Sequence, residues 1–284
     1  MERVEQQEQA IEPKREVPYP TNLVSRRGEY DQAYGERVHL MRSATLETLV
    51  ARLGGLDIRQ PELVTVLRTI YAELFLTAVD GELATVSAEV PTRMQAQHPE
   101  EGVWRGDLID PSQHVTFVDV IRAGLVPAQL CYELAASLLP DEQVRIDHLN
   151  MARLSDSEGR VVGVDLSGSK VGGRVDDHVL VLPDPMGATG STTRRVIDHY
   201  LETYGKPRRI LALPMIATPE YLKAVLEYED LVVYTARLDR GLSTPEVLAA
   251  APGVHWEEER GLNDQGYIVP GAGGVGEVLN NAWC

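Results

Sequence analysis

A short run of small and hydroxyl-bearing residues after an apolar segment offers a site for a phosphate group. The apolar segment covers residues 179–182, Asp184 follows it, and the next loop contains Gly187 and Gly190. A helix is predicted to begin near Thr192, so its unbonded N–H groups and the positive end of its dipole would face the loop. Glycine lets the backbone approach a ligand without a Cβ in the way. The pattern predicts an anion site in which Asp184 faces hydroxyl groups or a metal rather than phosphate.

The same residues also fit an ordinary strand-to-helix turn capped by serine or threonine, and short motifs often match by chance. Two other phosphate signatures are excluded. Residues 163–170 miss the Walker pattern, because Ser169 stands where a lysine must follow the second glycine. Residues 271–276 satisfy the GxGxxG pattern, but the eight residues that follow them are too few for a βαβ unit.

Apolar and helical segments alternate from residue 115 onward. Strands are expected over residues 115–121, 144–149, 179–182, 210–213 and 231–234, and helices over residues 125–139, 192–204 and 219–228. This alternation predicts an α/β fold with a mostly parallel central sheet and helices on both faces. Two helices are expected within residues 43–80, then a strand over residues 83–90 and irregular chain from Pro91. The Gly-, Ser- and Asp-rich segment Ser155–Asp177 is expected to leave the sheet as a long excursion, with a short hairpin near residues 161–164.

Composition limits the classes of partner. The 284 residues include 27 basic and 43 acidic side chains, a formal net charge of −16. A strongly negative surface repels polyanions, so neither nucleic acid nor a membrane surface is an expected partner, whereas a small anion can still be held locally. The two cysteines, Cys131 and Cys284, do not make a disulfide framework or a zinc site. The sequence shows no secretory signal or membrane-spanning stretch, so we expect a cytoplasmic protein.

Four segments together resemble the uracil phosphoribosyltransferase family. Residues 184–192 (DPMGATGST) resemble its motif for phosphoribosyl pyrophosphate (PRPP), and residues 120–125 (VIRAGL) resemble its pyrophosphate loop. Residues 151–153 (MAR) resemble its methionine-tyrosine-arginine segment, and residues 261–271 resemble its uracil-reading tail. The resemblance covers roughly residues 36–284. It implies the type I phosphoribosyltransferase fold, with the excursion as a lid or hood.

The resemblance also implies an organisation of the chain. Residues 1–35 would be a polar, flexible arm, or an arm that orders on a partner subunit, and residues 36–284 would be a single domain. Within that domain we expect N-terminal helices over residues 43–80, a core over residues 115–235, an insertion over residues 241–260 and a base-reading tail over residues 261–284. A homodimer or a higher homo-oligomer is implied as well.

The implied reaction transfers ribose 5-phosphate from PRPP to a nucleobase. The resemblance points to uracil, giving UMP and pyrophosphate in pyrimidine salvage. Asp184 and Arg122 would be the catalytic residues. The residues expected to bind PRPP are Arg122, Arg153, Asp184, Pro185, Met186, Gly187, Ala188, Thr189, Gly190, Ser191 and Thr192. The base would be read at Ile268, Gly273, Gly274 and Val275. Mg²⁺ is the expected cofactor, held mainly by PRPP and water rather than by a set of protein ligands. Lys170 and Arg174 lie on the candidate lid.

The sequence departs from the family pattern at four places. Gly274 stands where the family has an aspartate that contacts PRPP, Gly187 replaces a leucine and would loosen the phosphate loop, and Ala152 replaces an aromatic residue. Residues 241–260 are about twenty extra residues in a surface loop, a change that costs little stability. Two alternatives therefore stay open. The chain could use another pyrimidine-like or heteroaromatic base, or bind PRPP or a nucleotide as a regulatory protein without turnover.

Overall fold

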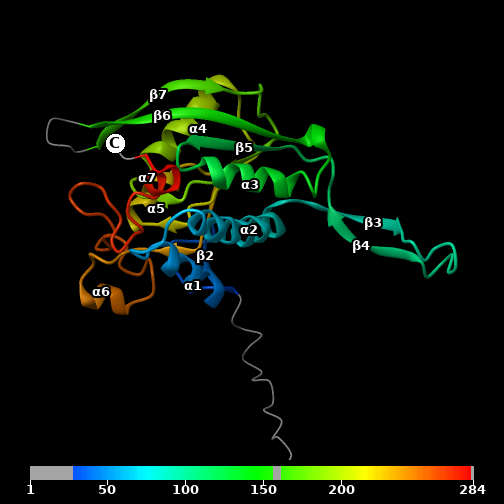
Figure 1. Cartoon of the computed structure of the whole chain (residues 1–284), viewed down its shortest axis with the longest axis horizontal. Helices are drawn as coiled ribbons and strands as arrows, with labels where there is room; N and C mark the ends of the chain where they lie inside the picture. Colours follow the sequence, from blue (N-terminus) through cyan, green and yellow to red (C-terminus); the bar gives the residue numbers. More distant parts are fainter. Residues whose placement is uncertain (1–27, 156–160, 283–284) are drawn as a thin grey trace, which may run out of the picture.

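The core of the molecule is a central sheet that contains eight strands among the described residues (Figure 1). The computed structural model describes residues 28–155 and 161–282, and side chains at residues 152–155 and 161–165 are outside this description. In spatial order the strands are β1 (Gly28–Glu29), β2 (Val38–Arg42), β12 (Leu231–Thr235), β10 (Arg209–Ala212), β8 (Val179–Leu182), β5 (Val115–Ile121), β6 (Val144–Ser155) and β7 (Val161–Lys170). Every neighbouring pair from β2 to β6 is parallel, and β1 and β7 add antiparallel edges. The predicted mostly parallel sheet is confirmed.

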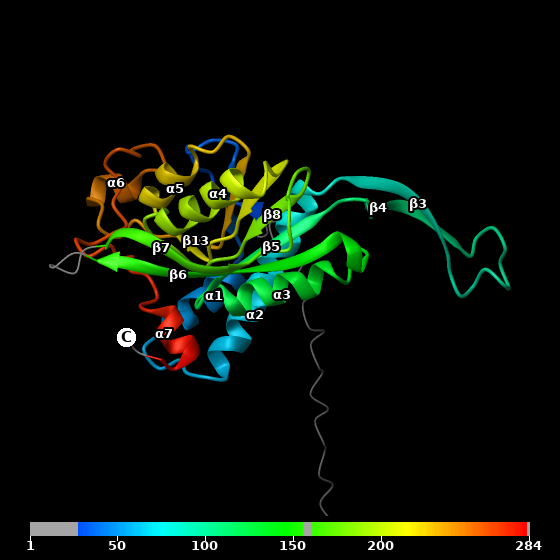
Figure 2. The ribbon, with the colours of Figure 1, turned by 90° about the horizontal axis from the view of Figure 1, so that it is seen from above.

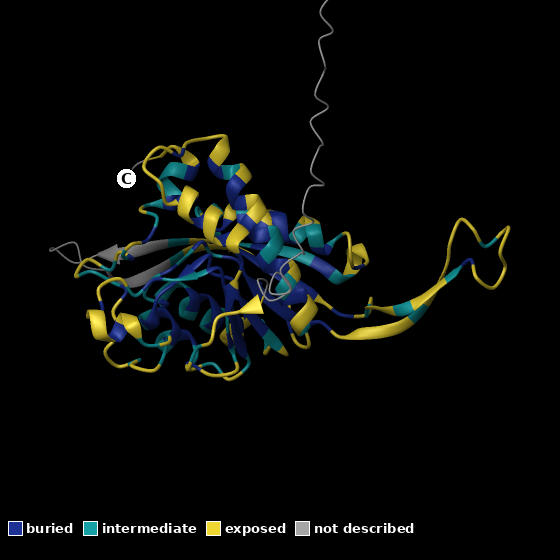
Figure 3. Cartoon of the chain, turned by 90° about the horizontal axis from the view of Figure 1, so that it is seen from below, coloured by how far each residue is buried: buried dark blue, intermediate teal, exposed yellow. Residues whose placement is uncertain are grey.

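Helices cover both faces of this sheet (Figure 2). One face carries α4 (Ser191–Thr203) and α5 (Pro219–Val225), and the other carries α1 (Ala44–Leu53), α2 (Glu62–Glu82) and α3 (Leu125–Ala135). Each face has its own cluster of buried apolar side chains. The central strand β8 is apolar and buried along its whole length, and β5 is buried over its first five residues and mostly apolar, because both faces of the sheet are covered here (Figure 3).

Short parallel strands lie just after three of the main strands and form a sheet of their own. They are β9 (Met186–Gly187), β11 (Ile216–Ala217) and β13 (Arg237–Leu238), which form a second small sheet in the order β13-β11-β9. Each follows a main strand closely, since β9 comes after β8, β11 after β10 and β13 after β12. In open α/β folds, ligands bind at the carboxyl ends of the parallel strands, which is where these short strands lie.

A long hairpin leaves the body of the molecule between α2 and β5 (Figure 1). Its strands are β3 (Thr85–Pro91) and β4 (Val103–Ile109), paired antiparallel from Thr85 opposite Ile109 to Pro91 opposite Val103. The sequence predicts the first strand but leaves the chain after Pro91 irregular, so β4 corrects that expectation. Both strands are mostly exposed, and an exposed strand lacks the apolar run that identifies a buried one (Figure 3).

The segment Ser155–Asp177 stays closer to the sheet than the sequence predicts. Strand β6 runs on to Ser155, and β7 returns antiparallel to it as far as Lys170. The chain after β7 is fixed to β6, because the backbone N–H of Gly172 donates to Asp147 Oδ1 (2.9 Å). The excursion is therefore largely an edge hairpin of the central sheet, and its action as a lid stays a prediction.

The insertion at residues 241–260 contains α6 (Pro245–Ala249) and packs against the beginning of the described chain. Arg240 Nη1 lies 2.8 Å from the buried Glu259 Oε1, and the hydroxyl of Tyr34 donates to the other oxygen of Glu259. The backbone N–H of Ala33 also donates to the carbonyl of Pro252 (2.7 Å). The end of the expected N-terminal arm is thus tied to the insertion, while residues 1–27 lie outside the described residues and the arm's role stays a prediction.

The remaining helical segments are the 3-10 helix Asp141–Gln143 and the C-terminal helix α7 (Val275–Asn280). Among the described residues, no helix is both long and apolar enough to cross a bilayer. The expected cytoplasmic location and the division of the chain into an arm and a single domain stay predictions.

Candidate active site

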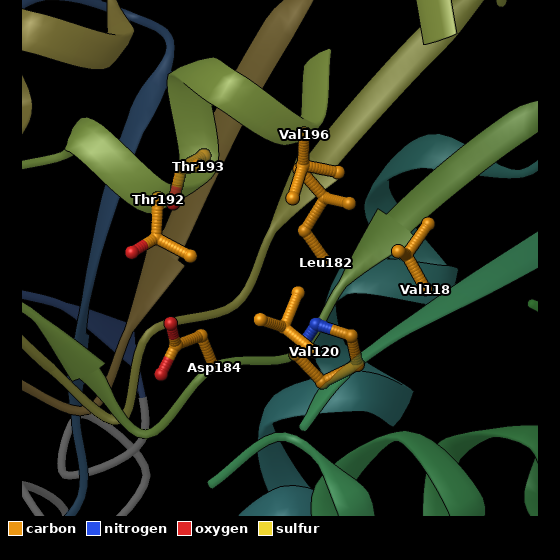
Figure 4. A pocket seen from close by; sticks show the side chains of 8 residues that line it. Val118, Val120, Leu182, Asp184, Thr192, Thr193 and Val196 are labelled. Atoms are coloured by element: carbon orange, nitrogen blue, oxygen red, sulfur yellow. The ribbon is translucent and has the colours of Figure 1, made fainter. Parts of the chain in front are cut away.

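A small pocket lies where the ends of β5 and β8 meet the start of α4 (Figure 4). Its lining residues are Val118, Val120, Leu182, Pro183, Asp184, Thr192, Thr193 and Val196. Asp184 is the charged residue of this set, and Figure 4 places its carboxylate on the side of the pocket where Thr192 lies. The pocket therefore lies between the loop predicted to bind phosphate and the ends of the two strands.

The loop between β8 and α4 presents backbone N–H groups at a helix start. Gly190 has a left-handed φ of +77°, and a Cβ there would stand 2.7 Å from the Cβ of Ala224. The first helical hydrogen bond runs from the N–H of Arg194 to the carbonyl of Gly190 (2.9 Å). The N–H groups of residues 191–193 precede that bond, and helix starts leave such groups without an intrahelical acceptor.

Hydroxyl groups inside the loop are already ordered. Thr189 Oγ1 lies 2.9 Å from Ser191 Oγ and accepts a long hydrogen bond from the Ser191 N–H (3.3 Å). Asp184 Oδ1 accepts from the N–H of Met186 (3.1 Å). One of the predicted phosphate donors, the Ser191 N–H, thus has an internal acceptor that a phosphate would have to replace.

Gly187 fits a space that allows no side chain, which contradicts the expectation that it loosens the loop. It is buried, and a Cβ on it would stand 2.9 Å from the Cβ of Pro214 and 3.1 Å from Cγ of Tyr221. In the small sheet, Gly187 of β9 pairs with Ala217 of β11. The glycine therefore allows the loop to pack closely against β11 and α5.

Tyr221 lies beneath the phosphate loop, a role that the sequence alone does not suggest. Its hydroxyl is 3.3 Å from Thr193 Oγ1, and its side chain is buried. Burial, assisted by the charge of Asp184, raises the pKa of Tyr221 above its usual range, so the phenol stays neutral. Tyr221 thus supports the helix start without adding charge to the site.

The predicted pyrophosphate loop lies beside both the phosphate loop and the tail. A Cβ on Gly124 would stand 3.4 Å from the carbonyl oxygen of Pro183, next to Asp184. A Cβ on Gly276 would stand 3.5 Å from the Cβ of Ala123. Arg122 follows a cis peptide bond, and its Nη1 donates to the carbonyl of Ala282 in the tail (3.0 Å). The structure thus brings together three of the segments that the sequence singles out.

Arg153 lies in β6, opposite Val164 of β7 in the register of the edge hairpin. The side chains of Arg153 and Ala152 lie outside the described residues, so the part that Arg153 plays in binding stays a prediction. Lys170 is exposed at the end of β7, and Arg174 pairs with Asp176 (2.5 Å). The positions of Lys170 and Arg174 fit a solvated surface and a lid equally well.

The tail folds into a turn whose sides are joined by a bridge between Leu262 and Ile268. Ile268 is buried, and Gly271 packs so closely on the Ile268 carbonyl that a Cβ would not fit. Gly273 is exposed with open space around it. Val275 packs its side chain into the apolar core, and its N–H donates to the Gly273 carbonyl (3.1 Å).

The described residues contain no group of three or more histidine, cysteine or acidic side chains that could hold a metal ion. Asp184 supplies oxygen atoms at the pocket, which are the donors that Mg²⁺ prefers. One carboxylate suits a cation that arrives already coordinated by phosphate oxygens, so the residues present fit the expected cofactor.

Comparison with known proteins gives a consistent family. A family model described as uracil phosphoribosyltransferase matches residues 40–255. A uracil phosphoribosyltransferase of Thermococcus gammatolerans is 25% identical over 177 residues, which is 61% of this chain and 64% of the relative. One of Thermococcus sibiricus is 25% identical over 175 residues, 61% of this chain and 62% of the relative. The alignments thus span less than two thirds of these relatives' length.

A solved structure shares the fold. The AQ2163 protein from Aquifex aeolicus superposes with a TM-score of 0.65 at 20% identity, covering 85% of this chain and 97% of that one. At this identity the likeness supports the α/β architecture alone. The family match ends at residue 255, before the tail that resembles a base-reading segment.

Proposed function

This chain belongs to the uracil phosphoribosyltransferase family, and we propose that it transfers ribose 5-phosphate from PRPP to uracil, releasing pyrophosphate. The observation that carries the proposal is that three segments lie next to one another at one edge of the central sheet. The loop after β8, the loop after β5 and the C-terminal tail approach one another at the carboxyl ends of the parallel strands. Such a reaction needs the phosphate, the pyrophosphate and the base to be held in line, and these segments supply the three corresponding surfaces.

The 5-phosphate would bind to the loop of residues 187–192. Its backbone N–H groups lie at the start of α4, and the hydroxyls of Thr189 and Ser191 already point toward one another. Asp184 would accept hydrogen bonds from the ribose hydroxyls. Its negative charge would also favour the positive charge that develops on the ribose carbon as pyrophosphate leaves.

The leaving pyrophosphate would be met by Arg122 and Arg153, since a planar guanidinium suits oxygen anions. The bond from Arg122 to the Ala282 carbonyl would then be exchanged for one to pyrophosphate, which is a stronger, charge-assisted bond. Mg²⁺ bound with the substrate would neutralise part of the pyrophosphate charge, and Asp184, which lines the pocket, would help to hold it.

The base would be read by the backbone of the tail, at Ile268 and at residues 273–275. A backbone N–H and C=O can match the donor and acceptor edge of uracil. The Val275 N–H already bonds to the Gly273 carbonyl, so reading the base there requires this turn to open or to use the other face of its carbonyl. A different pyrimidine-like base is the second candidate, favoured by the absence of a side chain at Gly274.

The two candidates, and the regulatory alternative, are separated by one assay. Pyrophosphate release is measured with PRPP, Mg²⁺ and a panel of bases. Turnover with uracil supports the proposal, and turnover with another base alone supports the second candidate. PRPP binding without release for any base would refute an enzymatic function and leave a PRPP-binding regulator.

We also propose that the protein is a homodimer or larger homo-oligomer whose partner covers the β3–β4 hairpin. One face of the hairpin carries the cross-strand pairs Val86–Leu108 and Val90–Trp104, and all four side chains are exposed. The other face is polar, since Arg105 pairs with Glu89 (2.8 Å). An isolated two-stranded hairpin is marginally stable in water, so an apolar face on it calls for a covering surface.

Light scattering tests this proposal. The wild-type mass is expected at twice the 31.4 kDa of the chain or at a higher multiple. Trp104→Glu on the apolar face is expected to shift the mass toward one chain, whereas Arg105→Gln on the polar face leaves it unchanged. A wild-type mass of one chain would refute the assembly.

A further inference from the structure

Helix α5 begins with Thr218-Pro219-Glu220, and this start touches the phosphate loop directly. The Thr218 N–H donates to the carbonyl of Gly187 (3.1 Å), and the Thr218 hydroxyl donates to the carbonyl of Ala188 (2.7 Å). Thr218 is fully buried and also caps α5, because its Oγ1 accepts from the Tyr221 N–H (3.0 Å). The carbonyls of the first two residues of the phosphate loop are therefore held by one threonine.

Two residues further on, the Glu220 carboxylate holds the beginning of the tail. The N–H of Gly261 donates to both oxygens of Glu220 (3.0 and 3.1 Å), and the N–H of Leu262 donates to Oε1 (3.3 Å). Gly261 lies against Thr218 as well, since a Cβ on Gly261 would stand 2.9 Å from the Thr218 Cβ. Hydrogen bonds from N–H groups to a carboxylate are stronger than those between neutral groups. The start of α5 thus anchors both segments, the phosphate loop through Thr218 and the tail through Glu220.

The far end of the same turn is anchored separately. The Gly271 N–H donates to Asp239 Oδ2 (2.8 Å), and Arg237 Nη2 donates to the Gly271 carbonyl (2.9 Å). Between these anchors, a Cβ on Gly266 would stand 3.8 Å from Cγ2 of Thr189 in the phosphate loop. Residues 261–271 therefore pass beside the phosphate loop with both ends fixed, and the start of α5 contacts both, through Thr218 on the loop and Glu220 on the tail.

We propose that Glu220 is a positioning residue that sets the base-reading tail in register with the phosphate loop. This inference rests on the proposed function, because it assigns to Glu220 the alignment of the base against the ribose. A displacement of about 1 Å in such a reaction can cost about 100-fold in rate. Glu220 itself would contact neither PRPP nor the base. It acts through the N–H groups of Gly261 and Leu262.

The chain provides a matched control. Helix α6 begins with Thr244-Pro245-Glu246, the same three residue types, and the Thr244 side chain caps it as Thr218 caps α5. Glu246 is exposed, and its carboxylate faces its own helix start. A substitution of Glu246 therefore repeats the local helix chemistry of Glu220 without the bonds to the tail.

The test compares Glu220→Ala, Glu220→Gln and Glu246→Ala. In Glu220→Ala we expect the KM for uracil to rise about tenfold or more, the size of effect that the loss of one charge-assisted hydrogen bond gives. The KM for PRPP should change little. Glu220→Gln keeps an acceptor oxygen, so a smaller rise is expected. Amide hydrogen exchange in residues 261–271 should quicken in Glu220→Ala. Glu246→Ala should match the wild type in both measurements.

Three outcomes would overturn the inference. An unchanged uracil KM in Glu220→Ala, with normal wild-type turnover, would refute it alone. A fall in kcat with both KM values and the exchange of residues 261–271 unchanged would show a general loss of folded protein. If Glu220→Ala does not fold, Glu220→Gln decides. A uracil KM and an amide exchange of residues 261–271 that both equal those of the wild type would then refute the inference. Absence of wild-type turnover with every base would instead refute the proposed function, and the positioning role of Glu220 with it.

Discussion

The carboxylate of Glu277 occupies the space that a side chain at Gly274 would fill. A Cβ on Gly274 would stand 2.8 Å from Glu277 Cδ and closer still to Oε2. Gly274 caps α7 and Glu277 lies in the first turn of that helix. The resemblance predicts a carboxylate at position 274, where the chain has none. The structure places a carboxylate beside that position from the next turn of the chain.

This relationship changes what is expected of Gly274→Asp. The added side chain would meet the flexible end of Glu277, which can move aside, so the remaining cost is the repulsion of two like charges in one helix turn, about 0.5 kcal/mol. We expect a lower melting temperature and no gain in uracil turnover. The double variant Gly274→Asp/Glu277→Ala should recover the melting temperature and exceed the single variant in turnover, with Glu277→Ala as the control. A single variant as stable as the wild type would contradict this packing.

Gly187→Ala distinguishes a close-packed glycine from one that loosens the loop. The Cβ would stand 2.9 Å from Pro214, which is buried between β10 and β11, and 3.1 Å from Tyr221, which is held in α5. We expect a loss of about 1–3 kcal/mol in the free energy of unfolding and weaker PRPP binding. Gly168→Ala, where a Cβ meets nothing within 4 Å, is the control. If Gly187 merely adds flexibility, alanine would stabilise the protein by about 0.4–1 kcal/mol.

The buried strands were predictable from the sequence because their environment leaves a clear pattern. Strands β5 and β8 begin and end at the predicted residues, since both faces are covered and the runs are mostly apolar. Strand β4 was not predictable, because its mostly exposed residues give no apolar run or regular alternation. Strand β7 lies at a sheet edge, where glycine, serine and aspartate are tolerated and resemble a loop in sequence.

The candidate site was predictable where its chemistry lies in one continuous segment. The loop after β8 is such a segment, and the pocket includes Asp184 and Thr192 as expected. The contacts of Glu220 and Glu277 were not predictable, because they join residues that only the fold brings together. The signal for Glu220 was present in part, since Thr-Pro-Glu marks a helix start, but the same three residues occur at 244–246 without contacting the tail.

Asp184→Asn tests whether the carboxylate serves the reaction or the fold. Asparagine keeps an oxygen that can accept from the Met186 N–H, so the loop should hold its shape. The negative charge facing the ribose would be lost. We expect kcat to fall by about 100-fold or more, with a small change in melting temperature. A large loss of melting temperature with a proportionate loss of rate would assign Asp184 a structural role.

A cross-strand pair beneath the pyrophosphate loop carries an unusual buried charge. Asp119 of β5 lies opposite His148 of β6, and the His148 Nδ1 is 2.8 Å from Asp119 Oδ2. The other oxygen of Asp119, Oδ1, is buried without a hydrogen-bond partner among the described residues. Burial raises the pKa of Asp119, and the contact with His148 offsets part of the rise.

Asp119→Asn should therefore gain stability relative to the wild type as pH rises. An acid whose pKa is raised by folding stabilises the folded state at low pH, and this contribution disappears as pH rises through the folded-state pKa. Asparagine does not ionise, so the difference in melting temperature, variant minus wild type, should increase between about pH 4 and pH 7. Asp110→Asn is the control: hydrogen bonds from Ser112 lower the pKa of Asp110, so its difference should fall as pH rises toward about 4 and stay level above it. Parallel curves for the two variants would contradict the burial of an unbonded carboxylate at Asp119.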